Sequence, residues 1–239
     1  MSKGSSGGNN AGASSLEEVR TIRRQIRSRE SLIREGPSST LALSTSRRRR
    51  DSVSELTIWA HQTASVLLSD SLPRRWSHVL GVADRAQLAI PLFSSHESDL
   101  LLAAALLHDI GYSPKIAHTG FHPLDGARAL KESIKNVRLI SLVAHHSCAY
   151  REAELRGLSA ELSEWVDEQT PLRDALWWAD MSTSPDGEPV LFDDRIKEIQ
   201  DRYGPQDVVT FFIRQAGPEL RGAVERTEAR LRAAGISYE

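Results

Sequence analysis

Residues 101–114 read LLAAALLHDIGYSP, and this stretch decides the fold. Apolar residues fill positions 101–107, which predicts a helix over residues 98–110 that is buried on every side. His108 and Asp109 end the run, and burying an imidazole and a carboxylate is costly unless each has a partner. Because both groups bind divalent ions, the stretch indicates a metal site at the end of a core helix.

Apolar residues recur at helical spacing on both sides of this stretch. Prolines near the starts of several segments and glycines near their ends support helix boundaries. No alternating pattern predicts a sheet. We therefore predict an all-α fold, a bundle of helices over residues 53–69, 73–91, 98–110, 123–134, 136–147, 159–168, 171–181, 188–202, 204–215 and 217–233.

Residues 1–52 differ in composition and predict a separate N-terminal extension. Residues 1–50 hold eleven Lys and Arg against four Glu, whereas the rest of the chain holds nineteen basic against twenty-eight acidic residues. Gly and Ser dominate the first fifteen positions, and residues 16–35 have weak helical periodicity, so we expect a disordered or loosely helical segment. Its basic charge leaves nucleic-acid binding open, but no aromatic residue is present for base stacking, which favours a solvated extension.

The composition excludes two classes of protein. No run of about 18 apolar residues predicts a membrane span, and no apolar segment near the start predicts a secretory signal. Cys148 is the single cysteine, so no intrachain disulfide is possible. We expect a cytoplasmic protein.

Further histidines and aspartates end or begin apolar segments elsewhere in the chain. His78 lies in RRWSHVLGVADRA, His122 begins HPLDGARAL, and Asp180 closes LRDALWWAD. His145 and His146 end VRLISLVAHH; since adjacent helical residues point about 100° apart, we expect only one of them to face a shared site.

The order His78, then His108-Asp109, then Asp180 resembles the H…HD…D signature of the HD superfamily, of which HDIG is a common second element. The resemblance covers most of residues 53–185 and implies an HD-domain bundle over residues 53–239. It implies that these four residues are the ligands of a first metal ion. In some HD families further histidines hold a second ion bridged by the HD aspartate, a role that His122 and either His145 or His146 would fill here. One or two divalent ions (Mn, Fe, Co, Mg or Zn) are therefore expected.

One position departs from the pattern of many HD hydrolases. They have a lysine after HDxG that is thought to meet the substrate phosphate, whereas this chain has Tyr112. We expect Lys115 or Arg75 to take that role, with Asp109 orienting the nucleophile. His118 is a weaker candidate, since it lies in the polar segment SPKIAHTG.

The resemblance implies a metal-dependent phosphohydrolase that acts on a nucleotide or a related small phosphate ester. Two alternatives remain open. Some HD-fold proteins use a similar ligand set as di-iron oxygenases, and the domain could instead be a non-catalytic module that binds a regulatory ligand. The sequence does not predict an oligomeric state.

Overall fold

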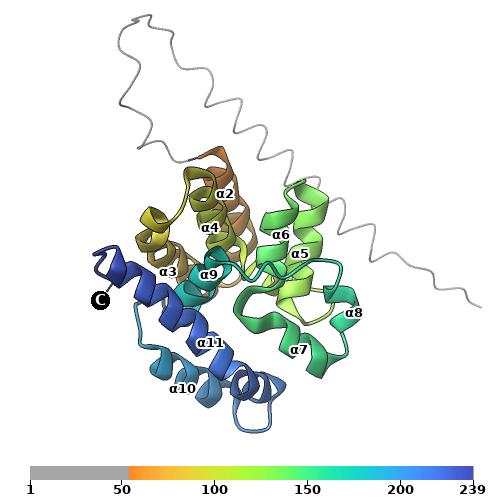
Figure 1. Cartoon of the computed structure of the whole chain (residues 1–239). Helices are drawn as coiled ribbons and strands as arrows, with labels where there is room; N and C mark the ends of the chain where they lie inside the picture. The colour runs from red at the N-terminus through yellow and green to blue at the C-terminus, as the bar shows by residue number, and fades with distance from the viewer. Residues whose placement is uncertain (1–53, 239) are drawn as a thin grey trace, which may run out of the picture. The chain divides into compact units, whose positions relative to one another are not determined.

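The computed structural model describes residues 54–238, and every regular element within this range is a helix. The prediction of an all-α fold is confirmed (Figure 1). The predicted N-terminal extension lies outside the described residues. The α-helices are α2 (Glu55–Leu68), α3 (Pro73–Ala89), α4 (Ser95–Leu107), α5 (His122–Ser133), α6 (Val137–Ala144), α7 (Ala149–Arg156), α8 (Ser159–Leu162), α9 (Pro171–Met181), α10 (Phe192–Tyr203) and α11 (Val208–Ala233).

Three short 3₁₀ turns follow α3, α4 and α6, and the last of them carries His146 of the predicted site. They are η1 (Ile90–Leu92), η2 (Ile110–Tyr112) and η3 (His146–Cys148). No helix within residues 54–238 combines the length and the apolar character that crossing a lipid bilayer requires.

Helix α4 forms the centre of the bundle. It begins at a capping box in which Ser94 and Glu97 satisfy each other's backbone N–H groups. From Leu100 to Leu107 nearly every side chain is buried, and the helix packs against α2, α3, α6 and α9. A helix that is apolar on all sides is stable only when other helices surround it. The C-terminal end of α4 therefore lies in the middle of the bundle.

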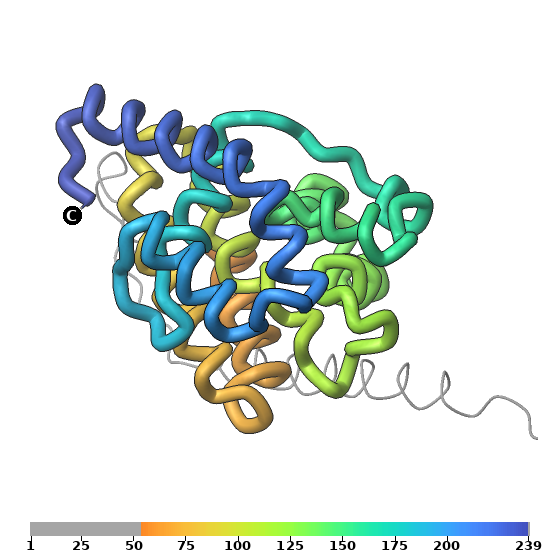
Figure 2. Tube along the Cα trace, turned by 90° about the horizontal axis from the view of Figure 1, so that it is seen from below, coloured from red at the N-terminus to blue at the C-terminus, as the bar shows by residue number. Residues whose placement is uncertain are grey.

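Helices α10 and α11 lie side by side and form one face of the bundle, with α11 also packed along α9 (Figure 2). Trp177 and Trp178 of α9 are fully buried in the core, as the apolar pattern around them predicts. Asp180 follows them near the end of the same helix.

The structure corrects several predicted helices. The segment 136–147 stops being α-helical at Ala144, only the first four residues of 159–168 are helical, and residues 149–156 form a helix that we did not predict. The helices predicted over 204–215 and 217–233 are one helix, α11. Pro218 lies inside it and removes one hydrogen bond, but buried residues on both sides, Ala216 and Leu220, keep the helix continuous against its neighbours.

Candidate metal centre

Five segments of the chain bring imidazoles and carboxylates together in the core. The contributing residues are His78 on α3, His108 and Asp109 after α4, His122 at the start of α5, His146 in η3 and Asp180 on α9. Their donor atoms form two groups, each within 4.8 Å and each able to hold a metal ion. We call His78, His108 and Asp180 the first ligand group, and Asp109, His122 and His146 the second.

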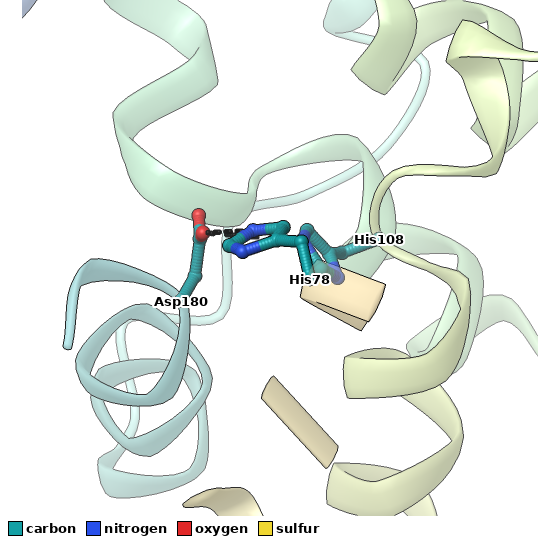
Figure 3. Close-up of side chains that lie close together, drawn as sticks. All are labelled: His78, His108 and Asp180. Atoms are coloured by element: carbon teal, nitrogen blue, oxygen red, sulfur yellow. Dashed lines mark hydrogen bonds and ion pairs between the residues drawn. The ribbon is translucent and has the colours of Figure 1, made fainter. Parts of the chain in front are cut away.

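The first ligand group is buried and compact (Figure 3). The Nε2 atom of His78 lies 3.1 Å from Oδ1 of Asp180, and the Nε2 atom of His108 lies 3.9 Å from the same oxygen. Two imidazole nitrogens and a carboxylate oxygen therefore face one point.

Asp109 connects the two groups. Its Oδ1 atom lies 3.3 Å from Nε2 of His122 and 3.9 Å from Nε2 of His146. Its Oδ2 atom lies 3.4 Å from Nε2 of His108 and 3.8 Å from Nε2 of His78. One carboxylate oxygen thus faces each group, which is the arrangement that a carboxylate bridging two ions requires.

Backbone carbonyls fix the orientation of three of the rings. The Nδ1 atom of His78 donates to Ser184 O at 2.9 Å, that of His108 to Ala105 O at 2.7 Å, and that of His146 to Val143 O at 2.7 Å. With the proton held on Nδ1, Nε2 presents its lone pair to the site. Metal-ligating histidines commonly have this second bond.

The Nε2 atom of His108 is buried and has no hydrogen-bond partner among the residues that the structure describes. A buried polar atom without a partner is uncommon and calls for an explanation. A divalent ion is the natural partner for a nitrogen that lies between two carboxylates, so the donor set fits a metal.

The protonation of three of the four histidines agrees with this arrangement. Burial lowers the pKa values of His78, His122 and His146, so their rings are neutral and can act as ligands near pH 7. Burial also acts to lower the pKa of His108, but the charges of Asp109 and Asp180 and the hydrogen bonds of the ring together outweigh it and raise that pKa to about 8. The His108 ring is therefore largely protonated at pH 7, and a metal ion would bind it with release of this proton.

The carboxyl groups remain ionised. Burial alone would raise the pKa of Asp109 and Asp180, but neighbouring cations reverse its effect and hold both values below their usual range. Among the groups that lower these pKa values, the charge of Arg75 has the largest effect on Asp109, and the contact with His78 has the largest effect on Asp180.

Close backbone contacts bring the second ligand group to the first. A Cβ atom on Gly111 would lie 1.9 Å from the carbonyl oxygen of His122 and 2.8 Å from the nitrogen of Gly126. Only glycine at position 111 therefore lets the start of α5 pack directly against the turn that follows Asp109.

A strained turn after α6 separates the two adjacent histidines. Ser147 and Cys148 both have positive φ angles, of 47° and 61°. The turn directs His146 to the site, and the Ser147 hydroxyl donates to Oδ2 of Asp180. His145 points elsewhere: its Nε2 atom bonds Trp165 O at 2.8 Å, and it belongs to neither ligand group.

The two candidate phosphate contacts lie in different places. Arg75 donates to Oδ2 of Asp109 at 2.7 Å, and its guanidinium lies 4.0 Å above the ring of Tyr112, which in turn stacks on His122. Lys115 donates to Val66 O and does not line the cavity beside the ligand groups. His118 is exposed and likewise lies outside that cavity.

Sequence reasoning missed two arginines. Arg195 and Arg202 of α10 line the cavity next to the ligand groups, together with apolar residues such as Phe212 of α11. Arg195 is 4% exposed, and its Nη2 atom lies 3.8 Å from Oδ1 of Asp180. The spacing of Arg195, Ile199 and Arg202 places them on one face of a helix, but only the packing of α10 shows which way that face points.

Comparison with known proteins gives one match. A family model described as HD domain matches residues 75–202, the range from Arg75 to the end of α10 that includes every residue of both ligand groups. Neither the search of curated proteins nor the search of solved structures found a match.

Proposed function

The chain belongs to the HD domain family, and from this premise we propose that it is a metal-dependent phosphohydrolase acting on a nucleotide or a related small phosphate ester. The observation that carries the proposal is the position of Asp109, whose two oxygens face two separate groups of ligands. Such a pair of sites suits a reaction in which an attacking and a leaving oxygen are held in line.

The proposed ligands follow the two groups. His78, His108, Asp109 and Asp180 would hold the first ion, and Asp109 would share its other oxygen with a second ion held by His122 and His146. A bound divalent ion lowers the pKa of water toward neutrality and polarises a phosphoryl oxygen.

The charges around the ligand groups favour an anionic substrate. Arg75, Arg195 and Arg202 line the adjacent cavity. Arginine forms paired hydrogen bonds with phosphate oxygens, and such bonds strengthen where water is excluded. Arg75 comes from another helix to lie over Tyr112, the residue that replaces the lysine of many HD hydrolases, so it can supply the cation that the lysine would have provided.

Asp109 and Arg75 have linked roles in this proposal. The guanidinium of Arg75 binds Oδ2 of Asp109 and fixes the rotation of the carboxylate, while Tyr112 holds both Arg75 and His122 by stacking. Arg195, with its Nε atom buried and free of any hydrogen-bond acceptor in the described chain, can donate to a phosphoryl oxygen as negative charge develops there.

The same ligand set would serve a di-iron oxygenase, and a non-catalytic binding module would use the same cavity. The three arginines favour an anionic substrate, and the completeness of both ligand groups favours turnover over binding alone. Metal identity and turnover separate the three functions.

The test is an activity panel on protein loaded in turn with Mn²⁺, Co²⁺, Mg²⁺, Zn²⁺ or Fe²⁺. Phosphomonoesters, phosphodiesters and nucleotides are supplied, and released phosphate or nucleoside is measured together with oxygen consumption in the iron sample. We expect release of phosphate with at least one metal and loss of it in His108→Ala, while His118→Ala, which changes an exposed histidine, keeps it. Oxygen consumption without hydrolysis would favour the oxygenase, and a panel without turnover would favour the binding module.

A further inference from the structure

Helix α10 presents a stripe of charge and apolar surface to the cavity beside the ligand groups. Arg195, Ile199 and Arg202 all line this cavity, and their spacing of four and three residues places them on one helix face. The two arginines are seven residues apart, which separates their backbones by about 10 Å along the helix. The stripe therefore has a cation at each end and an apolar side chain between them.

Arg195 is the inner end of this stripe. It is buried beside Asp180, and of its guanidinium only Nη1 has a close acceptor, Oε2 of Glu198 at 2.6 Å. Its Nε atom is buried without a hydrogen-bond partner in the described chain. An ionised group with spare donors next to the ligand groups is suited to an oxygen of the reacting phosphate.

Arg202 is the outer end and is accessible to solvent. Its Nε atom lies 3.3 Å from Oε1 of Glu198, and its guanidinium lies 4.9 Å above the ring of Tyr203. Glu198 thus holds both arginines, one with each carboxylate oxygen, and neutralises only one of the two charges.

A second cavity, of about 300 Å³, adjoins the first at this end. Arg75 and Arg202 line both cavities, and Arg74 lines the second. No carboxylate lines the second cavity. Arg74 is paired with Asp186, which does not itself line the second cavity. The border between the cavities therefore has two cations, Arg75, which is paired with Asp109, and Arg202, whose partner Glu198 is shared with Arg195.

Helix α11 adds an apolar part to the lining of the same cavity. Val209, Phe212 and Ile213 form this part, which we call the α11 wall, and Tyr203 adds an aromatic ring next to Arg202. Glu152 also lines the cavity, and it is bound by Arg156 at 2.7 Å. A flat or apolar body fits between these residues and Ile199 better than a strongly polar one.

We propose that the substrate of this site carries a second anionic group, bound by Arg202 at the border of the two cavities, while its reacting phosphate meets Arg195. The body that joins the two anions is flat or apolar and lies between Ile199 and the α11 wall. This inference rests on the proposed function for the identity of the reacting group, but the subsite at Arg202 is defined by the residues of α10 and α11.

Two matched probes test it by binding alone. Phenylphosphonate carries one anionic group on a flat ring, and 4-carboxyphenylphosphonate adds a carboxylate at the far side of the same ring. Neither has a phosphoester bond to hydrolyse. Affinities are measured by calorimetry on the full chain, with and without Mn²⁺, at low ionic strength.

We expect the carboxylated probe to bind about tenfold more tightly than phenylphosphonate, the size of one charge-assisted pair. In Arg202→Gln this preference falls below about twofold. Lys197→Gln is the matched control: it removes the same charge from the same helix, but Lys197 is exposed on the face opposite the stripe, and the preference stays. In Arg195→Gln both probes bind more weakly, and Arg195→Lys restores part of the loss if the fold is unaffected.

A wild-type preference below twofold would overturn the inference, as would a preference that survives Arg202→Gln. Because neither probe is turned over, the result is independent of the activity panel. If the protein hydrolyses esters but does not prefer the carboxylated probe, the second subsite is wrong and the proposed function is unaffected. If the protein prefers the carboxylated probe through Arg202 but hydrolyses no ester, the proposed function is wrong and the subsite is unaffected.

Discussion

The carboxylate of Asp109 has one oxygen toward the first ligand group and one toward the second, and Gly111 makes the second approach possible. In HDIG the glycine therefore has a steric role that can be separated from the chemistry of the two residues before it. Any side chain at position 111 would overlap the backbone of His122.

Gly111→Ala should displace the start of α5 and move His122 from Asp109. We expect a loss of stability of about 1–3 kcal/mol from overpacking, together with weaker binding at the second ligand group. Urea unfolding and metal titration measure the two effects. Gly217→Ala is the control, because a Cβ atom there meets nothing within 4 Å. An alanine at 111 that leaves both quantities unchanged would contradict the packing described here.

Ser147 combines backbone strain with a hydrogen bond to Asp180. Ser147→Gly and Ser147→Ala both remove the hydroxyl, but only glycine adopts a positive φ without cost, so the glycine variant should be more stable by about 1 kcal/mol. Thermal unfolding of the pair measures this difference. Both variants should bind metal more weakly than the wild type, since Oδ2 of Asp180 loses its donor. Equal stability of the two variants would show that the turn relaxes.

At the scale of elements, the apolar run of residues 101–107 was sufficient to predict the core helix, because a helix that is apolar on all sides is stable only when it is buried in the core. The prolines at the starts of α3, α5 and α9 marked those helices. Pro218 was misleading, since the packing of α11 outweighs the local preference of one residue. Helix α7 could not be predicted, because it begins after two residues whose strained conformation depends on the tertiary structure.

Helices α9 and α11 are joined by an ion pair that makes stability depend on pH. Arg226 binds both oxygens of Asp174 at 2.8 Å, and Arg230 lies 3.3 Å from one of them. Burial acts to raise the pKa of Asp174, but the arginines outweigh it and the pKa lies below its usual value. A carboxyl with a lowered folded pKa stabilises the protein above its unfolded pKa of about 4 and loses that contribution as pH falls further.

Asp174→Asn should therefore destabilise the protein by about 1 kcal/mol at pH 6–7, a modest value because Arg226 is half exposed. The difference from the wild type should shrink below about pH 4, as the wild-type carboxyl takes up a proton. Urea unfolding from pH 3 to pH 7 follows this trend. If the difference in stability between the two proteins grew as the pH fell, the lowered pKa assigned to Asp174 would be wrong.

At the scale of the whole molecule, the resemblance to the H…HD…D signature pointed to His78, His108, Asp109, His122 and Asp180, and the structure brings their donor atoms close together. The choice between His145 and His146 could not be made, because it depends on the turn at Ser147 and Cys148. Arg195 and Arg202 were missed, since nothing in the sequence shows which face of a polar helix lies beside the site. Lys115 looked equivalent to Arg75 along the chain, but it bonds Val66 and lies outside the cavity.

The ligands come from five segments far apart in the sequence, so a metal ion would bind the folded chain and not the unfolded one. Saturating Mn²⁺ should raise the melting temperature, with a gain in stability of about 2.7 kcal/mol at a free concentration one hundred times Kd. A chelator should reverse the gain. His108→Ala should show a smaller response than His118→Ala, and an identical response of these two variants would place the bound metal elsewhere.

The most direct measurement of the central claim is an anomalous difference map from crystals of the Mn²⁺-loaded protein. The account predicts two peaks about 3.5–4 Å apart, one at each ligand group, with Asp109 between them. A map without density at either group, or with a single ion that Asp109 does not contact, would contradict it.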